Sequence, residues 1–313
     1  MAYVTPTSKT TGDLIAATDW NQNTVDNPIA IKAQVDALGI VKPCNGRLSL
    51  TTAVPVTTAD VTAATTLYWV PYQGNQIALY NGSSWVVFAQ AQLSIAVPAT
   101  TNQMYDVFID YNAGTPVLTL TAWTNDTTRA TALTMQDGVY VLTGSTGKRY
   151  VGSFRTTGVV GQTEDSAAKR YVFNYTNRVT RQLSVNASGT SYWTYTTAAW
   201  RQAAGNSAFQ LDVVVGVAEE AIQAVVSVAA SNSTGGMDYY VGIGYDSTTA
   251  PLVKNIGQMP ANLNHVMTVA LSHIPAAGRH YYAWCEYSYN VGTTTWTGAS
   301  GQILSGISGI YRM

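Results

Sequence analysis

From residue 47 onward, apolar and polar positions alternate in short runs that predict one β-strand after another. The run 104–111 (MYDVFIDY) is a clear case, with Tyr105, Val107 and Ile109 on one face. Turn signals such as the Asn-Gly pair at 81–82, whose residues tolerate positive φ, separate the runs. Their spacing of about 8–12 residues predicts sandwiches or barrels rather than alternating strands and helices.

This pattern predicts an all-β fold of two antiparallel β-sandwich (jelly-roll-like) domains, preceded by an extended arm and a short helix. A polar turn near 162–165 and the basic stretch that follows it place the boundary, so the predicted domains are 46–185 and 186–313. Glycine spacing and β-branched residues favour strands throughout the second domain. The segment 219–228 is the exception, where a helix stays open as an alternative.

The first 45 residues differ from the rest and are predicted to anchor or oligomerise the protein. Thr18 is placed to cap a short helix, and Pro28 suits the first turn of a second helix ending at Gly39. A helix of about three turns is marginal alone, so its apolar stripe must pack on the β domain or on identical helices of other subunits. The predicted docking and oligomerisation residues are Trp20, Ile31, Val35 and Leu38.

Charge is scarce: 16 basic and 17 acidic side chains make up only 11% of the 313 residues, against roughly 25% in an ordinary soluble domain. Because charge is depleted at interface cores, the composition favours a surface covered by a partner or a second copy. A monomer with a hydroxyl-rich surface is the alternative. The net charge of -1 argues against nucleic-acid binding, and neither a membrane-spanning run nor a secretory signal is expected.

Catalytic and metal-binding patterns are weak, so the prediction is a protein that is not an enzyme, with no catalytic, cofactor-binding or metal-binding residues. No nucleophile elbow occurs, and the spacing of His265, His273 and His280 matches no metal motif. Asp106 and Asp110 would lie about 13 Å apart on one strand face, wider than the roughly 5–9.5 Å of glycosidases. They are expected to form a solvated face. The other acidic pairs are Glu164 with Asp165 and Glu219 with Glu220.

Two further groups admit a structural and a functional interpretation. Arg170, Arg178 and Arg181 could contact an anion or nucleic acid, but the near-neutral charge favours ion-paired arginines stacked on tyrosines between the domains. Cys44 and Cys285 are predicted to be packing thiols, and they could form a disulfide only if the ends of the two domains meet.

Tryptophans in the second domain are the best candidates for ligand contact. Aromatic rings combine apolar faces with polar tips, which suits sugars and protein partners. Alternate aromatics in a strand more commonly line a core or an interface between subunits, and that interpretation is preferred. The residues named for receptor or glycan contact are Trp193, Trp200, Trp284 and Trp296.

Residues 44–185 resemble a domain found in bacteriophage virion proteins of the tail-fibre, head-fibre or minor structural type. The strings that carry the resemblance begin CNGRLSLTTAVPV and WTNDTTRATALTM, and they occupy 44–82, 123–141, 148–157 and 161–181. The segment 11–27 also resembles the start of phage structural proteins, and the C-terminal region is similar to phage β-sandwich domains in style. Trp123, Asn125 and Asp126 match a motif of the family and are interpreted as a fold-defining turn.

The resemblance implies a non-enzymatic component of the virion, usually a homotrimer, that contacts other virion proteins and projects β domains for host attachment. No catalytic residue carries over. Two alternatives stay open: a capsid decoration (cement) protein, or a module that recognises a host surface glycan as its receptor.

Overall fold

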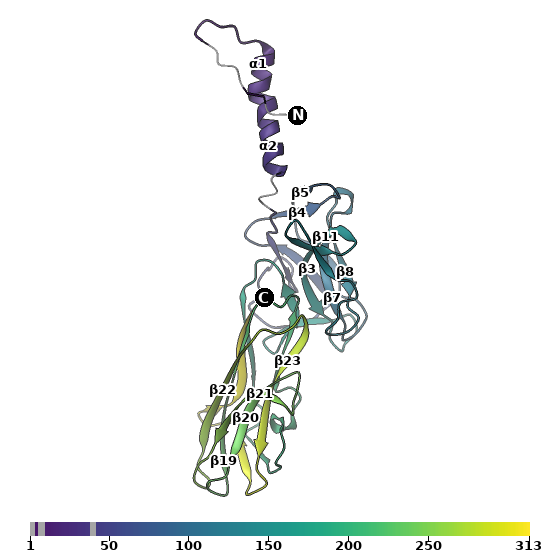
Figure 1. Ribbon diagram of the computed structural model, residues 1–313. Helices are drawn as coiled ribbons and strands as arrows, with labels where there is room; N and C mark the ends of the chain where they lie inside the picture. The colour runs from purple at the N-terminus through teal and green to yellow at the C-terminus, as the bar shows by residue number, and fades with distance from the viewer. Residues whose placement is uncertain (1–3, 6–9, 38–41) are drawn as a thin grey trace.

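A computed structural model describes residues 4–5, 10–37 and 42–313, with the side chains of residues 33 and 35–37 outside the description. Figure 1 shows a helical N-terminal segment that stands away from a β body, and the C-terminus lies near the middle of that body. The predicted all-β class, with antiparallel sheets packed as in a sandwich, is confirmed.

The N-terminal segment is one continuous helical rod, made of α1 (Ala17–Asn21), the π-helical η1 (Gln22–Asp26) and α2 (Asn27–Ala37). Two separate helices were expected because Pro28 has no N–H to donate to the carbonyl of Thr24. Instead the turn widens before the proline, and the Asn27 N–H donates to the Gln22 carbonyl in the π pattern. Thr18 lies inside α1 and Ala16 before it makes no side-chain cap, so the predicted hydroxyl cap is wrong.

The first β region contains two sheets and a hairpin. The small sheet has the order β1 (Gly46–Ser49), β3 (Thr66–Pro71) and β6 (Leu93–Ala96). The hairpin joins β4 (Gln76–Tyr80) to β5 (Trp85–Ala89) through the predicted Asn-Gly turn. The larger sheet has the order β8 (Val117–Ala122), β7 (Met104–Asp110), β11 (Ser145–Arg155), β10 (Val139–Leu142) and β9 (Leu133–Gln136), and β14 (Val172–Asn174) pairs with β11. A 3-10 turn, η2 (Asn112–Gly114), links β7 to β8.

The second β region is a pair of facing sheets. One has the order β2 (Val61–Ala64), β12 (Thr163–Asp165), β13 (Lys169–Arg170), β18 (Gln210–Val215), β23 (Gly278–Ser288), β20 (Tyr239–Tyr245) and β21 (Pro251–Gly257), and β17 (Arg201–Gln202) pairs with β23. The other has the order β15 (Thr180–Asn186), β27 (Gly306–Arg312), β19 (Ile222–Asn232), β24 (Thr294–Thr297) and β16 (Tyr192–Tyr195), and β22 (His265–His273) pairs with β19. A small ladder of β25 (Ala299–Ser300) with β26 (Ile303–Leu304) and the 3-10 turn η3 (Ala203–Gly205) complete it.

Alternation along the strands explains which faces pack. In β22, Met267 and Val269 point into the core whereas Val266 faces solvent. The ambiguous segment 219–228 is a short turn followed from Ile222 by strand β19 (Ile222–Asn232), which pairs with three neighbours, and so the helical alternative is wrong.

Strand β7 is buried on both faces. Val107 and Ile109 join a smaller core formed within the first β region, while Phe108 joins a larger core that extends through the second. The expectation that Asp106 sits on a solvated face is therefore wrong, because the polar side of this strand faces a second layer of protein.

The two β regions are joined by shared sheets and a shared core. Strands β12 and β13, which lie in the predicted first domain 46–185, and β15, which crosses its end, pair into the sheets of the second region, and β13 runs parallel to β18. Gly216 makes the approach close, since a Cβ there would stand 2.2 Å from the Tyr150 hydroxyl and 2.3 Å from the Phe173 ring. The boundary at 185/186 stays a prediction about folding units.

Candidate functional site

The helical rod α1–η1–α2 stands away from the β body (Figure 1), and large apolar side chains in and just before it are exposed to solvent. Leu14 is 93% exposed and Trp20 is 61% exposed. Neither hydrophobic core of the described chain contains a residue before Cys44. We call residues 10–37 the projecting segment, and its exposed large apolar side chains are Leu14, Ile15, Trp20, Val25, Ile29 and Ile31.

Side-chain hydrogen bonds within the projecting segment join residues three or four apart in the sequence, and one further pair joins the segment to Val4. Asp13 accepts from the backbone N–H of Thr10 at 2.7 Å, and the Thr24 hydroxyl donates to the Trp20 carbonyl at 2.7 Å. Asn27 is buried and bonds both backbone groups of Val4, at 3.0 and 2.9 Å. These bonds shape the helix and leave its apolar side chains uncovered. Among the described helices, none combines the length and apolar character needed to cross a membrane.

The predicted docking residues are placed as follows. Trp20 lies in α1 and Ile31 in α2, and both are exposed. The side chain of Val35 and the whole of Leu38 lie outside the described residues, so the predicted single stripe is not tested there. Ile29, which the heptad-like pattern missed, is exposed as well. Because it lies two residues from Ile31, about 200° around the helix axis, apolar surface is present on opposite sides of α2.

The four tryptophans named for glycan contact differ in burial. Trp284 and Trp296 are fully buried in the core of the second region, so a role as external contacts is wrong for them. Trp193 packs against the same core, its ring 5.6 Å from that of Trp284, and its Nε1 donates to Glu286 at 2.5 Å. Trp200 alone of the four belongs to no core cluster. All four have the same side chain, yet Trp193 and Trp200 are half-buried whereas Trp284 and Trp296 are fully buried, because different neighbours pack on each of them.

Trp200 lies at an open groove on the outer face of the second region. The groove has a volume of about 220 Å³ and is lined by Trp200, Tyr240, Lys254, Tyr287 and Tyr289. The centroid of the Trp200 ring lies 5.5 Å from that of Tyr287 and 6.2 Å from that of Tyr240. We call these five residues the aromatic groove.

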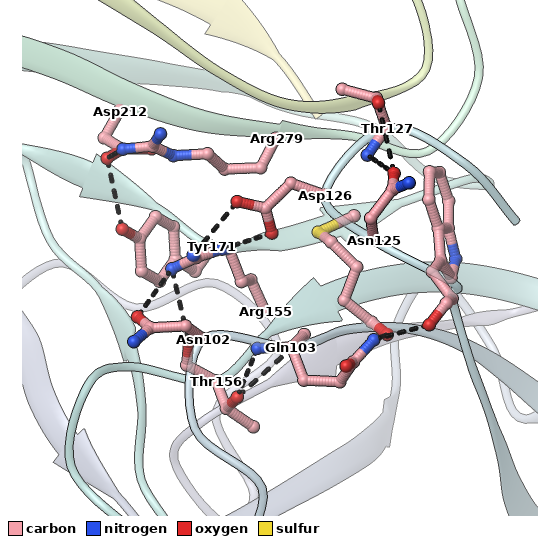
Figure 2. Close-up of polar contacts among 12 residues, drawn as sticks. Asn102, Gln103, Asn125, Asp126, Thr127, Arg155, Thr156, Tyr171, Asp212 and Arg279 are labelled. Atoms are coloured by element: carbon pink, nitrogen blue, oxygen red, sulfur yellow. Dashed lines mark hydrogen bonds and ion pairs between the residues drawn. The ribbon is translucent and has the colours of Figure 1, made fainter.

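The motif of Trp123, Asn125 and Asp126 forms a turn, as predicted, and the turn fastens the two β regions together (Figure 2). The Asn125 side-chain oxygen accepts from the Thr127 N–H at 2.9 Å. Both carboxylate oxygens of Asp126 accept from Arg155, at 2.9 and 3.1 Å. The Asp126 carbonyl accepts from the N–H of Arg279 at 2.8 Å, which brings in strand β23.

Arg279 continues this network into the second region. Its Nε donates to Asp212 at 2.7 Å, and the Tyr171 hydroxyl donates to the same carboxylate at 3.2 Å (Figure 2). A second buried ion pair lies nearby, between Asp106 and Arg129 at 2.7 Å. The same guanidinium donates to the Gly216 carbonyl at 2.5 Å. The junction is therefore a structural network whose charges are satisfied internally.

The basic stretch 170–181 is also internally paired, which confirms the structural interpretation. Arg170 and Arg181 each lie 3.0 Å from Asp165. Arg178 bonds Glu219 at 2.6 Å and stacks over the Phe173 and Tyr175 rings. The arginines are more buried than a surface patch would be, because they lie between the two β regions.

The remaining candidates for chemistry make structural contacts. His280 bonds Asp246 at 2.7 Å, His273 bonds the Tyr282 hydroxyl at 3.0 Å, and His265 lies elsewhere in β22. Within the described residues no group of histidine, cysteine and carboxylate side chains could hold a metal ion. Cys44 and Cys285 are both buried and free, so the disulfide does not form.

Glu286 is the buried carboxyl with the clearest shift. Burial raises the pKa of Glu286 to about 7, although Trp193, Arg201 and the backbone N–H of Ala204 donate to it. Arg201 also stacks over the Tyr195 ring at 3.8 Å. This carboxyl therefore holds the segment from β16 to η3 against the core.

Comparisons with known proteins give no family. No protein-family model and no curated protein matches the sequence. Among solved structures, similar chains occur in infectious bursal disease virus, Gx strain (TM-score 0.30, 10% identity, 82% of this chain and 72% of that one) and in its VP2 subviral particle (TM-score 0.32, 12% identity, 86% and 73%). The insecticidal delta-endotoxin Cry8Ea1 from Bacillus thuringiensis is also similar (TM-score 0.27, 7% identity), with 86% of this chain covering only 52% of the toxin.

Proposed function

We propose that this chain is a non-enzymatic structural protein of a bacteriophage particle. In this proposal it docks on the particle through residues 1–45, projects its β body outward as a fibre or spike component, and assembles as a homotrimer. The exposure of apolar side chains along the projecting segment carries the proposal. The resemblance of residues 44–185 to phage virion proteins supports the choice of particle.

The projecting segment has the properties of an incomplete interface. Burying a side chain such as leucine, isoleucine or tryptophan stabilises a protein by roughly 1.5–3 kcal/mol, and six of them remain outside the cores here. A helix that is apolar on more than one side needs neighbours on more than one side. Identical helices from sister subunits together with a particle protein supply such neighbours, which is why a trimeric bundle is proposed rather than one contact.

Light scattering on the full chain tests the assembly. We expect three times the monomer mass, and we expect the double variant Trp20→Asp, Ile29→Asp to fall toward one monomer mass, because charges would be placed in the helix interface. A matched control is Leu252→Asp, an exposed apolar residue of β21 outside the segment, which should leave the mass unchanged. A full chain that is monomeric at high concentration would end the trimer proposal.

Electron microscopy of particles tests the docking and separates a fibre from a decoration protein. The double variant should be absent from particles that carry the unchanged chain. Density projecting from the tail or from a unique head site supports a fibre, whereas density on every capsomer would replace it by the decoration alternative. Normal incorporation of a chain lacking residues 1–45 would refute the docking role.

A further inference from the structure

The aromatic groove is a second feature whose surface is not used by the fold. Tyr240 of β20 and Tyr287 of β23 are register partners, with ring centroids 5.5 Å apart. Tyr289, which follows β23, places its ring 5.6 Å from that of Tyr287 and is 39% exposed. Trp200, just before β17, closes the other side.

These four rings face away from the core. Their chain neighbours Tyr239, Glu286 and Ser288 are fully buried, so the pleat directs Tyr240 and Tyr287 to the opposite side of the sheet. None of the four rings belongs to either core cluster. Their packing on one another leaves apolar faces and polar tips lining an open hollow of about 220 Å³. Tryptophan and tyrosine in such a setting are typical of contact sites.

The polar groups at the groove select the kind of ligand. Lys254 of β21 is exposed at its edge, and the structure gives its ammonium no hydrogen bond or ion pair among the described residues. Aromatic rings by themselves would favour a cationic ligand. The ammonium of Lys254 would repel such a cation from this groove. The Tyr240 hydroxyl donates to Asp238 at 3.3 Å, so its oxygen can still accept from a ligand hydroxyl.

We propose that the aromatic groove binds a pyranose sugar bearing an acidic substituent. The apolar face of the ring stacks on Trp200 and the tyrosines, a ring hydroxyl donates to Tyr240, and the carboxylate or phosphate pairs with Lys254. This goes beyond the docking role, and it holds whether or not the projecting segment docks. If the β body points outward from a particle, the ligand would be a sugar of the host surface.

Binding of the full chain to a panel of acidic oligosaccharides (uronic-acid, sialic-acid and phosphate-bearing) and their neutral counterparts tests the proposal by calorimetry. We expect acidic members to bind more tightly. Trp200→Ala should weaken binding about tenfold by removing the stacking surface. Lys254→Gln should weaken binding of acidic sugars by about threefold to fivefold and leave neutral ones unchanged.

Two controls keep the outcome interpretable. Tyr192→Ala removes an exposed aromatic of β16 outside the groove and should change nothing. Thermal unfolding checks that each variant folds. Lys254→Gln carries the test if Trp200→Ala does not fold, because Lys254 is exposed and has no hydrogen-bond or ion-pair partner in the part of the chain that the structure describes. The proposal is overturned if no acidic sugar binds, if Lys254→Gln leaves the affinity for acidic sugars unchanged, or if choline binds in their place. Failure here leaves the assembly of the projecting segment untouched, since that is read from mass and microscopy.

Discussion

The projecting segment and the junction of the two β regions treat their side chains in opposite ways. At the junction even charged groups are buried, and Asp106, Asp212 and their arginine partners satisfy one another. In the projecting segment, apolar side chains such as Leu14 and Trp20 stand in water. The difference teaches that buried charges at the junction are satisfied within one chain, whereas the apolar side chains of the projecting segment stay exposed, which is the observation behind the proposed docking role.

The largest change in the free energy of unfolding is expected when a buried ion pair of the junction is broken. Asp106→Ala leaves the mostly buried Arg129 without its carboxylate, and we expect the free energy of unfolding to fall by about 3–5 kcal/mol. Urea unfolding of the purified chain measures this. Asp13→Ala, in the projecting segment, is the control and should change the free energy by less than about 0.5 kcal/mol. A loss below about 1 kcal/mol for Asp106→Ala would show that the junction does not depend on this pair.

A second test uses pH to weaken the β body. Burial raises the pKa of Glu286 to about 7 from an ordinary value of 4.5, so the folded chain holds this proton more tightly than the unfolded chain. Protonated Glu286 therefore adds to the free energy of unfolding. This contribution is complete below pH 4.5 and is lost as the pH rises through 7, by about 3 kcal/mol in total. Denaturation at several pH values should show this fall, and Glu286→Gln should flatten it. An equal pH dependence in both proteins contradicts the assignment.

A smaller effect is expected where the junction meets solvent. Asp126 is partly exposed, so Asp126→Asn, which keeps the shape and weakens the bonds from Arg155, should cost about 1–2 kcal/mol. Asp110→Asn is a matched control, because its contact with Lys148 at 3.9 Å is looser and more exposed. Equal losses in the free energy of unfolding for the two variants would show that the turn at 123–129 does not hold the two β regions together.

The smallest change in the free energy of unfolding is expected for a substitution in the projecting segment. Ile29→Asp changes an exposed side chain that belongs to neither core, so the free energy of unfolding of the β body, measured with urea, should stay within about 0.5 kcal/mol of the original. Near-ultraviolet circular dichroism of the buried aromatic rings should also be unchanged. A large loss would mean that the projecting segment packs on the β body in solution, and the contrast between the two regions would disappear.

Much of the fold followed from local pattern. Strand β7 and the hairpin of β4 and β5 lie where alternation and the Asn-Gly turn predicted them, because a strand's period of two and a turn's need for positive φ depend on adjacent residues. The turn of Asn125 and Asp126 was also found, on a resemblance. The site was predicted less completely. Trp20 and Ile31 are exposed as a docking element requires, but Ile29 was missed because a single stripe was assumed.

What the sequence by itself determined is the alternation of faces, the strand and turn content and the scarcity of charge. Only the tertiary structure decided what each face meets. The packing of distant strands placed Asp106 beneath a second layer and Trp284 inside the core, and it left Trp200 half-buried at the aromatic groove. Arg178 pairs with Glu219, which lies 41 residues further along the chain. Periodicity is a property of neighbours along the chain, whereas burial and charge pairing depend on which distant strands stack, and that is set by the packing of the whole.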